Sequence, residues 1–145
     1  MKECIFCRIV EGDAPARVVY ENDETMAFLD VNPLSRGHTL VIPKEHYEGF
    51  DDLPEDVGSS LMSSLRRLVP EIEAAVEADG ANVGFNDGAA AGQEIGHLHG
   101  HVIPRFEGDG GRPIHAVAGR KPKLSDDELD DLADTIEATI ESGGA

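Results

Sequence analysis

The spacing of apolar residues along the chain predicts five strands and two helices. Short apolar runs, either alternating or continuous, are typical of strands. Such runs occupy residues 18–20, 25–30, 38–42, 82–86 and 97–103. The polar residues 21–24 separate the first two runs and favour a tight turn. We therefore expect an antiparallel hairpin at the start of the sheet.

Between the third and fourth strands, apolar residues recur every three or four positions and predict an amphipathic helix. These positions are Leu61, Leu65, Leu68, Ile72 and Val76. Asp52 and Pro54 are suited to the start of this helix, and Gly80 to its end. Pro70 removes a helical hydrogen bond and crowds the preceding turn, so we expect a kink or a break at that position.

A second helix is predicted over residues 125–141. The motif Ser-Asp-Asp-Glu at residues 125–128 is a capping box, and apolar residues follow it at helical spacing. The glycine-rich residues 107–122 contain two prolines and predict a loop. The order of elements predicts a single α+β domain over residues 1–145, built on an antiparallel sheet.

The composition is strongly acidic, with 29 Asp and Glu residues against 12 Lys and Arg residues and a formal net charge of -17. This charge would repel a nucleic-acid backbone and argues against nucleic acid or a membrane surface as a partner. No apolar run approaches the roughly 20 residues that span a bilayer, and the N-terminus lacks the apolar stretch of a signal peptide. We expect a soluble, cytoplasmic protein.

Three of the six histidines alternate along one predicted strand. Successive strand side chains point to opposite faces, so His97, His99 and His101 are expected to share one face. The outer two would stand roughly 13 Å apart, too far for all three to bind one metal ion. A neutral imidazole can instead displace a leaving group at phosphorus and form a phosphorus–nitrogen intermediate that water cleaves. The pattern predicts phosphate chemistry with His99 as the nucleophile.

Further motifs surround these histidines in a fixed order between Cys4 and Arg105. They are Ile5-Phe6-Cys7-Arg8-Ile9, Phe28-Leu29-Asp30, Gly37-His38-Thr39-Leu40-Val41-Ile42-Pro43-Lys44-Glu45-His46, Asn86 and Gly92-Gln93. Together with the three histidines they resemble the histidine triad (HIT) family, in its branch of phosphoramidase-like (HINT-type) hydrolases. The resemblance implies a HIT-like fold with a five-stranded antiparallel sheet, and a homodimer in which two sheets join.

The resemblance also implies a role for each histidine. His99 matches the nucleophile that attacks the α-phosphorus and becomes transiently nucleotidylated. His101 matches the residue that contacts the phosphate and the leaving group, and His38 matches an outer histidine that supports the triad by hydrogen bonding. His97, the first of the triad, completes the catalytic set. Relatives that transfer nucleotides carry glutamine at the third triad position, so His101 favours hydrolysis.

A purine nucleotide site is implied in the same way. Asp30 matches the carboxylate that accepts hydrogen bonds from the ribose hydroxyls, and Asn86 and Gln93 match polar contacts on the phosphate side. The residues that match an apolar purine slot are Ile5, Phe6, Ile9 and Leu40, and ordinary core packing explains these four equally well. Glu94 stands where some relatives carry a hydroxyl residue, which leaves the leaving-group preference open.

Cys4 and Cys7 are the only cysteines and form a C-x-x-C pair. A disulfide is not expected in a cytoplasmic protein, and the βαβ setting of a thioredoxin-like site is absent. The pair supplies two of the four ligands of a tetrahedral zinc site. By the family resemblance, His46 and His97 complete a structural zinc site. The alternative is that these four residues are partly buried and bind no metal.

The leading interpretation is an enzyme that cleaves a nucleoside 5'-monophosphate, expected to be AMP, from a phosphoramidate or related conjugate. Dinucleoside polyphosphate hydrolysis uses the same nucleophile but needs room for a second nucleotide, and the sequence does not separate the two. A non-catalytic nucleotide-binding zinc module is the third interpretation. The intact set of four histidines disfavours it.

The acidic residues are spread over both predicted helices and the loops, which indicates adaptation to molar intracellular salt. At about 1 M salt the screening length is about 3 Å, so the self-repulsion becomes tolerable. We therefore expect a protein from a salt-adapted archaeon whose thermal unfolding midpoint rises when KCl is added. Calorimetry over a KCl series checks this expectation, and full stability in dilute buffer with no gain from KCl would contradict it.

Overall fold

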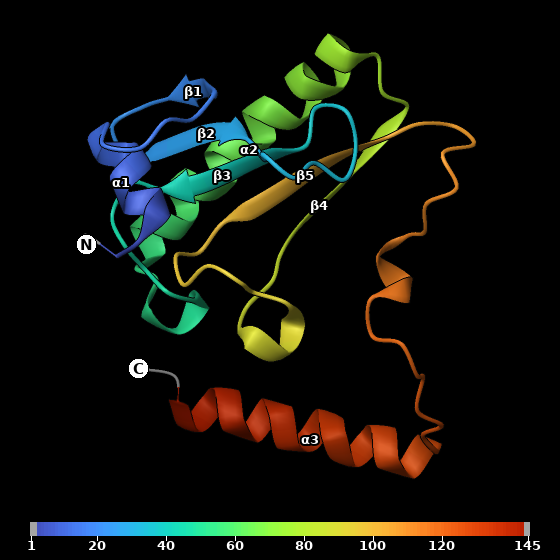
Figure 1. Ribbon diagram of the computed structural model, residues 1–145. Helices are drawn as coiled ribbons and strands as arrows, with labels where there is room; N and C mark the ends of the chain where they lie inside the picture. Colours follow the sequence, from blue (N-terminus) through green and yellow to red (C-terminus); the bar gives the residue numbers. More distant parts are fainter. Residues whose placement is uncertain (1–2, 144–145) are drawn as a thin grey trace. The chain divides into compact units, whose positions relative to one another are not determined.

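The computed structural model describes residues 3–143, which divide into two compact units on either side of the Gly111–Arg112 bond (Figure 1). The first unit carries the sheet, and the second carries one long helix. The helices of the first unit are α1 (Ile5–Glu11) and α2 (Glu55–Val76). Its strands are β1 (Val18–Glu21), β2 (Thr25–Leu29), β3 (Thr39–Pro43), β4 (Gly80–Phe85) and β5 (Gly100–Arg105).

The five strands form one antiparallel sheet in the order β1-β2-β3-β5-β4. The predicted α+β class and the five-stranded antiparallel sheet are confirmed. The expected hairpin joins β1 and β2, and its turn closes on Asn22. The side-chain Oδ1 of Asn22 accepts hydrogen bonds from the backbone N–H groups of Glu24 (3.0 Å) and Thr25 (2.8 Å). This local bonding is why four polar residues suffice to reverse the chain.

The central strands β2 and β3 are buried on both faces because apolar side chains pack against each face of the sheet. Alternate residues of a strand point to opposite faces, and the core accordingly falls into two clusters. The cluster shared with α2 contains Ala27, Val41, Leu61, Leu65, Leu68, Leu98 and Val102. The cluster shared with α1 contains Phe6, Met26, Phe28, Leu40 and Ile42. The predicted functional histidines lie on the α1 face.

Helix α2 confirms the predicted amphipathic helix but differs from the prediction along its length. It runs through Pro70 without a break. Leu68 and Ile72, on either side of Pro70, pack against the sheet and offset the one backbone hydrogen bond that the proline removes. The helix ends at Val76, where Glu77 adopts the left-handed conformation (φ 57°), so Gly80 begins β4 instead of ending the helix.

Helix α1 is not predicted by the pattern of apolar residues, because its seven residues are too few to display a helical period. Its ends are nevertheless set by the sequence. The Cys4 Sγ accepts a hydrogen bond from the N–H of Cys7 (3.4 Å) and caps the first turn, and Gly12 ends the helix with φ 83°. The C-x-x-C spacing is therefore also the start of a helix.

The histidine segment is only partly a strand. Strand β5 begins at Gly100, and residues 97–99 precede it in an irregular conformation, so the predicted strand over residues 97–103 is wrong at its start. The backbone N–H of Leu98 bonds to the carbonyl of Tyr47 (2.7 Å), outside the sheet ladder. Gly100 lies opposite Phe85, and a Cβ there would be 2.9 Å from that ring. A larger residue at position 100 would require the Phe85 ring to shift.

The second unit holds helix α3 (Asp126–Gly143). Its predicted capping box is present, since the N–H of Glu128 donates to Ser125 Oγ (3.1 Å) and the N–H of Ser125 donates to Glu128 Oε1 (3.1 Å). Its apolar residues, such as Leu132 and Ile136, are exposed. Among the described residues, no helix has the length and apolar character needed to cross a membrane.

Candidate active site and metal centre

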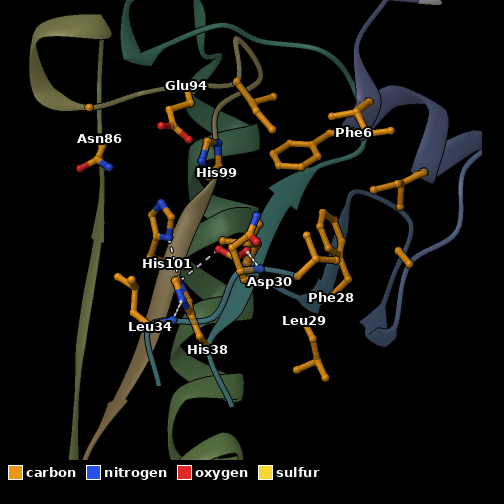
Figure 2. Close-up of a pocket in the computed structure, with 18 of the residues that line it drawn as sticks. Phe6, Phe28, Leu29, Asp30, Leu34, His38, Asn86, Glu94, His99 and His101 are labelled. Carbon is orange, nitrogen blue, oxygen red and sulfur yellow. Dashed lines mark hydrogen bonds and ion pairs between the residues drawn. The ribbon is translucent and has the colours of Figure 1, made fainter. Parts of the chain in front are cut away.

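A cavity of about 540 Å³ lies on the α1 face of the sheet (Figure 2). One part of its lining is apolar and includes the residues expected to form a purine slot, Ile5, Phe6, Ile9 and Leu40. The other part is polar and includes Asp30, His38, Asn86, Glu94, His99 and His101. Segments far apart in the sequence thus bring an aromatic wall and a group of hydrogen-bonding side chains to one space.

A chain of hydrogen bonds fixes the proton positions of two histidines. Burial lowers the pKa of His38, against the opposing effect of Asp30, so this ring is neutral near pH 7. The N–H of Leu34 donates to its Nδ1 (3.0 Å), so the ring proton of His38 is on Nε2. That N–H donates to Nδ1 of His101 (3.0 Å).

His101 consequently carries its own proton on Nε2. Burial, and after it the neighbouring His99 and His38, lowers the pKa of His101 to about 4, so the ring is neutral. Its Nε2 is buried and has no hydrogen-bond partner among the described residues. A buried donor without an acceptor costs about 1–3 kcal/mol. An anionic oxygen in the cavity would remove this cost.

His99 is held in the complementary orientation. Its Nδ1 lies 2.8 Å from the backbone carbonyl of His97, which can only accept, so the proton of the neutral ring is on Nδ1 and the lone pair is on Nε2. The ring stands 5.2 Å from Phe6 and 5.0 Å from His101, each in an edge contact. A nucleophilic nitrogen and an N–H donor therefore lie side by side at the cavity.

Asp30 follows β2 directly and lines the same cavity. One of its oxygens accepts the N–H of Asn32 (2.9 Å), and the other lies 3.7 Å from Nε2 of His38. Two carboxylate oxygens offer about four acceptor sites, so capacity remains for hydroxyl donors. The backbone turn at Asn32 holds the carboxylate at the cavity.

Gln93 differs from the other expected binding residues because it does not line the cavity. Its amide nitrogen donates to the carbonyls of Glu48 (2.8 Å) and Ile95 (2.9 Å), and its Oε1 accepts the N–H of Gly88 (2.8 Å). These three bonds leave the side chain little capacity for a ligand. The side chain of Gln93 instead stabilises the loop that carries its neighbour Glu94.

Other lining residues are not singled out by the sequence motifs as ligand contacts. Phe28 packs edge-on to Phe6 at 5.3 Å and extends the aromatic wall. Phe28 and Met26 are two positions apart along β2, so both point to the α1 face, as the pattern of apolar residues alone could have indicated. Ile95 and Leu34 come from irregular segments, where no periodicity reports which way a side chain points.

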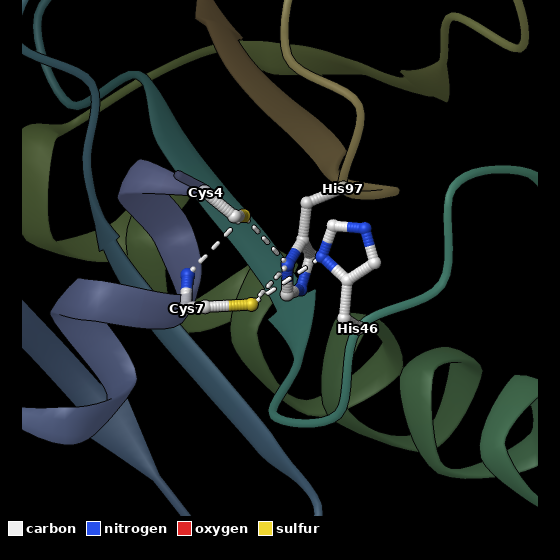
Figure 3. A group of neighbouring side chains, drawn as sticks. All are labelled: Cys4, Cys7, His46 and His97. Atoms are coloured by element: carbon white, nitrogen blue, oxygen red, sulfur yellow. Dashed lines mark hydrogen bonds between the residues drawn. The ribbon is translucent and has the colours of Figure 1, made fainter. Parts of the chain in front are cut away.

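A second group of side chains, two cysteines and two histidines, lies beside α1 (Figure 3). The four ligand atoms of Cys4, Cys7, His46 and His97 all lie within 4.8 Å of one another. Nδ1 of His97 lies 3.4 Å from Sγ of Cys4 and 3.6 Å from Sγ of Cys7, which in turn lies 3.3 Å from Nδ1 of His46. Three distant segments thus meet at one point.

The distances fit a tetrahedral metal site. With zinc–sulfur bonds of about 2.3 Å and zinc–nitrogen bonds of about 2.0–2.1 Å, neighbouring sulfur and nitrogen ligands stand about 3.6 Å apart. The tautomer of His97 fits as well, because its Nε2 lies 2.8 Å from the carbonyl of Pro43 and donates to it, which leaves the Nδ1 lone pair towards the thiols. Burial lowers the pKa of His97 to about 4, so the ring is neutral.

His97 and Phe6 connect the two groups. The ring of His97 belongs to the group that could hold a metal ion, while its carbonyl orients His99. Phe6 contacts the rings of both His97 (5.8 Å) and His99 (5.2 Å), and it lies between the two cysteines in the sequence. Any change in the position of α1 must therefore reach the cavity.

Comparison with known proteins gives a consistent result. The family model described as HIT domain matches residues 11–108. An uncharacterised HIT-like protein of Methanocaldococcus jannaschii is 50% identical over 107 residues, which are 74% of this chain and 82% of that protein. An adenylylsulfatase of Arabidopsis thaliana is 43% identical over 107 residues, 74% of this chain and 54% of that protein.

The fold is similar to that of solved structures as well. A zinc-bound histidine triad family protein from Mycobacterium smegmatis superimposes with a TM-score of 0.72 at 34% identity, covering 95% of this chain and 98% of that one. The matched family model spans all five strands of the sheet and all three residues of the triad. The chain belongs to the HIT family, whose members bind nucleotides and are typically hydrolases.

Proposed function

We propose that the protein hydrolyses conjugates of a nucleoside 5'-monophosphate, with AMP as the expected nucleotide and a phosphoramidate as the expected substrate. The observation that carries the proposal is the pairing of His99 Nε2, a free lone pair, with the unpartnered N–H of His101 at one cavity. The first nitrogen suits attack on phosphorus. The second suits a hydrogen bond to a phosphate oxygen on which charge builds.

In the first step, the Nε2 lone pair of His99 forms a bond to phosphorus. The bond between phosphorus and the leaving nitrogen breaks, and its electron pair goes to that nitrogen, which takes up a proton from water. The nucleotidylated ring now carries positive charge, and its Nδ1–H remains bonded to the carbonyl of His97, which stabilises the charge. His101 Nε2–H binds a non-bridging oxygen of the phosphate.

In the second step, water attacks the same phosphorus and releases a proton to the solvent, and the phosphorus–nitrogen bond to His99 breaks. The electron pair returns to Nε2, and the nucleoside monophosphate leaves. The cavity lining holds the substrate in both steps. The apolar wall with Phe6 and Phe28 suits a purine, and Asp30 suits the ribose hydroxyls. His38 acts by positioning His101 and fixing its tautomer.

The Arabidopsis relative supports the chemistry, since its name describes cleavage of an adenylyl group from sulfate. The same nucleophile would serve dinucleoside polyphosphates, and a non-catalytic nucleotide-binding zinc module would keep the pocket without turnover. Comparing AMP release from phosphoramidates and dinucleotides with nucleotide binding separates these alternatives.

Replacing the nucleophile tests the proposal. We expect His99→Ala to lower kcat/KM for adenosine phosphoramidate by at least about 10³-fold, because no other group can form the covalent bond. AMP release is followed chromatographically in KCl-containing buffer, with diadenosine polyphosphates as a second substrate. His115→Ala, an exposed histidine outside the cavity, is the matched control and should retain wild-type activity.

Equal rates for wild type and His99→Ala would contradict the assignment of the nucleophile. AMP formed only from the dinucleotides would favour polyphosphate hydrolysis, and nucleotide binding without turnover would favour the binding module. Intact-mass analysis of wild type quenched during turnover should detect a chain carrying one AMP, which His99→Ala should lack.

We further propose that Cys4, Cys7, His46 and His97 bind a structural zinc ion, supported by their spacing and by the zinc-bound relative. Zinc would tie α1 to the segments that carry His46 and His97, next to the purine wall. It would take no part in the covalent steps. A reducing compartment keeps the thiols available, which agrees with the expected cytoplasmic location.

The metal proposal predicts about one zinc per chain in protein purified without chelators, measured by elemental mass spectrometry. Cys7→Ser and His46→Ala should lose most of the metal. They should also lower the thermal midpoint by about 10 °C, because zinc would no longer bind and stabilise the folded state. His115→Ala should change neither. A zinc content near zero in the wild type would refute the site.

We propose a homodimer in which β4 strands of two chains pair. The sheet leaves β1 and β4 at its edges, and β1 is short and irregular in register. Strand β4 has the sequence GANVGF, without charge or proline, and so lacks the features that protect an edge from pairing. Light scattering coupled to size exclusion should give twice the 15.5 kDa chain mass at micromolar concentration. A monomer mass would contradict the proposal.

A further inference from the structure

The charges that line the cavity are all negative. Among the described lining residues only Asp30 and Glu94 are acidic, and none is Lys or Arg. Burial lowers the pKa of both His38 and His101, so these rings add no positive charge near pH 7. A site expected to hold a phosphate therefore offers N–H donors to it but no permanent cation. Any further anionic group on the substrate would meet repulsion instead of a counter-charge.

The two carboxylates have different surroundings. Asp30 accepts a backbone N–H and lies near His38, so part of its capacity is used. Glu94 has no hydrogen bond or ion pair with any residue in the range 3–143, and it is exposed at the cavity. Its backbone is nevertheless held, because Gln93 makes three hydrogen bonds to the surrounding loops. The Glu94 carboxylate is therefore available to a ligand, while the backbone that carries it is held in place.

Glu94 also stands on the side of the cavity away from the apolar wall. Figure 2 shows Glu94 and Asn86 on one side of His99, with Phe6 and Phe28 on the other. A purine on the aromatic wall and a ribose at Asp30 would place the nucleoside on that second side. The remaining side, which Glu94 and Asn86 line, is left for the group that departs from phosphorus.

We propose that Glu94 selects substrates whose leaving group carries a positive charge, such as an amine with a second, ammonium-bearing end. This inference rests on the proposed hydrolase function and names its substrate class. When the phosphorus–nitrogen bond breaks, the departing amine takes up a proton, and its distant ammonium group keeps its charge beside the Glu94 carboxylate throughout. Leaving groups with anionic ends, including sulfate and a second nucleotide phosphate, are disfavoured by the same field.

Three adenosine 5'-phosphoramidates of similar size test the proposal. Their leaving amines are 1,2-diaminoethane, with a cationic end, n-propylamine, with a neutral end, and β-alanine, with an anionic end. The intermediate on His99 is the same for all three, so differences in kcat/KM report the first step alone. AMP release is measured at the lowest KCl concentration that keeps the protein folded, and again at high KCl.

For the wild type we expect kcat/KM to fall by about two- to fivefold at each step from the cationic to the neutral to the anionic substrate, the range of a solvent-accessible charge contact. High KCl should compress these ratios because it screens the charges. Glu94→Gln, which keeps the size of the side chain, should bring the ratios close to one. Glu11→Gln, an exposed carboxylate of α1 outside the cavity, is the matched control and should keep the wild-type ratios and rates.

The outcomes distinguish a failure of selection by Glu94 from a failure of the proposed hydrolase activity. Ratios near one in the wild type, or wild-type ratios in Glu94→Gln, would overturn the selection by Glu94 while AMP release that depends on His99 continued. An equal loss with all three substrates in Glu94→Gln would also overturn it, since a role in the common chemistry moves rates but not ratios. No AMP from any of the three would overturn the hydrolase itself.

Discussion

The hydrogen bond from His99 Nδ1 to the backbone carbonyl of His97 is the interaction on which the rest of the site depends. It decides which nitrogen of His99 carries the lone pair, and it can form only because residues 97–99 leave the regular strand. In a regular strand that carbonyl would lie in the plane of the sheet, within the ladder. The ring of His97 is fixed in turn by the carbonyl of Pro43 and by its place among the thiols.

His97 therefore connects the cysteine–histidine group beside α1 with the cavity that His99 lines. Cys4 and Cys7 bring the start of α1 to His46 and His97, and α1 places Phe6 against both His97 and His99. The same helix supplies part of the apolar wall of the cavity. One short helix and one backbone carbonyl therefore position His99 and part of the apolar wall together.

The sequence predicts the regular parts of this molecule well and the irregular parts poorly. The sheet, the amphipathic α2 and the capping box of α3 follow from the spacing of apolar residues and from hydrogen bonds between residues near one another in the sequence. Helix α1 is too short for such a period, and the departure of His97 from the strand depends on a tertiary bond between Leu98 and Tyr47. The loop role of Gln93 likewise depends on Glu48, 45 residues away.

The rings of His38 and His101 are neutral because they are buried, so the cavity offers an anion hydrogen bonds instead of a permanent positive charge. At about 1 M salt, screening over about 3 Å weakens attraction at a distance, so a lysine or arginine at the cavity would do little to draw a phosphate from solution. Hydrogen bonds from His101 act at contact and are unaffected by this screening. A carboxylate such as Glu94 can likewise discriminate only among groups that reach its immediate surroundings. In a chain of net charge -17 at such a salt concentration, the position of a carboxylate within the cavity would then affect a bound group more than the summed charge of the surface.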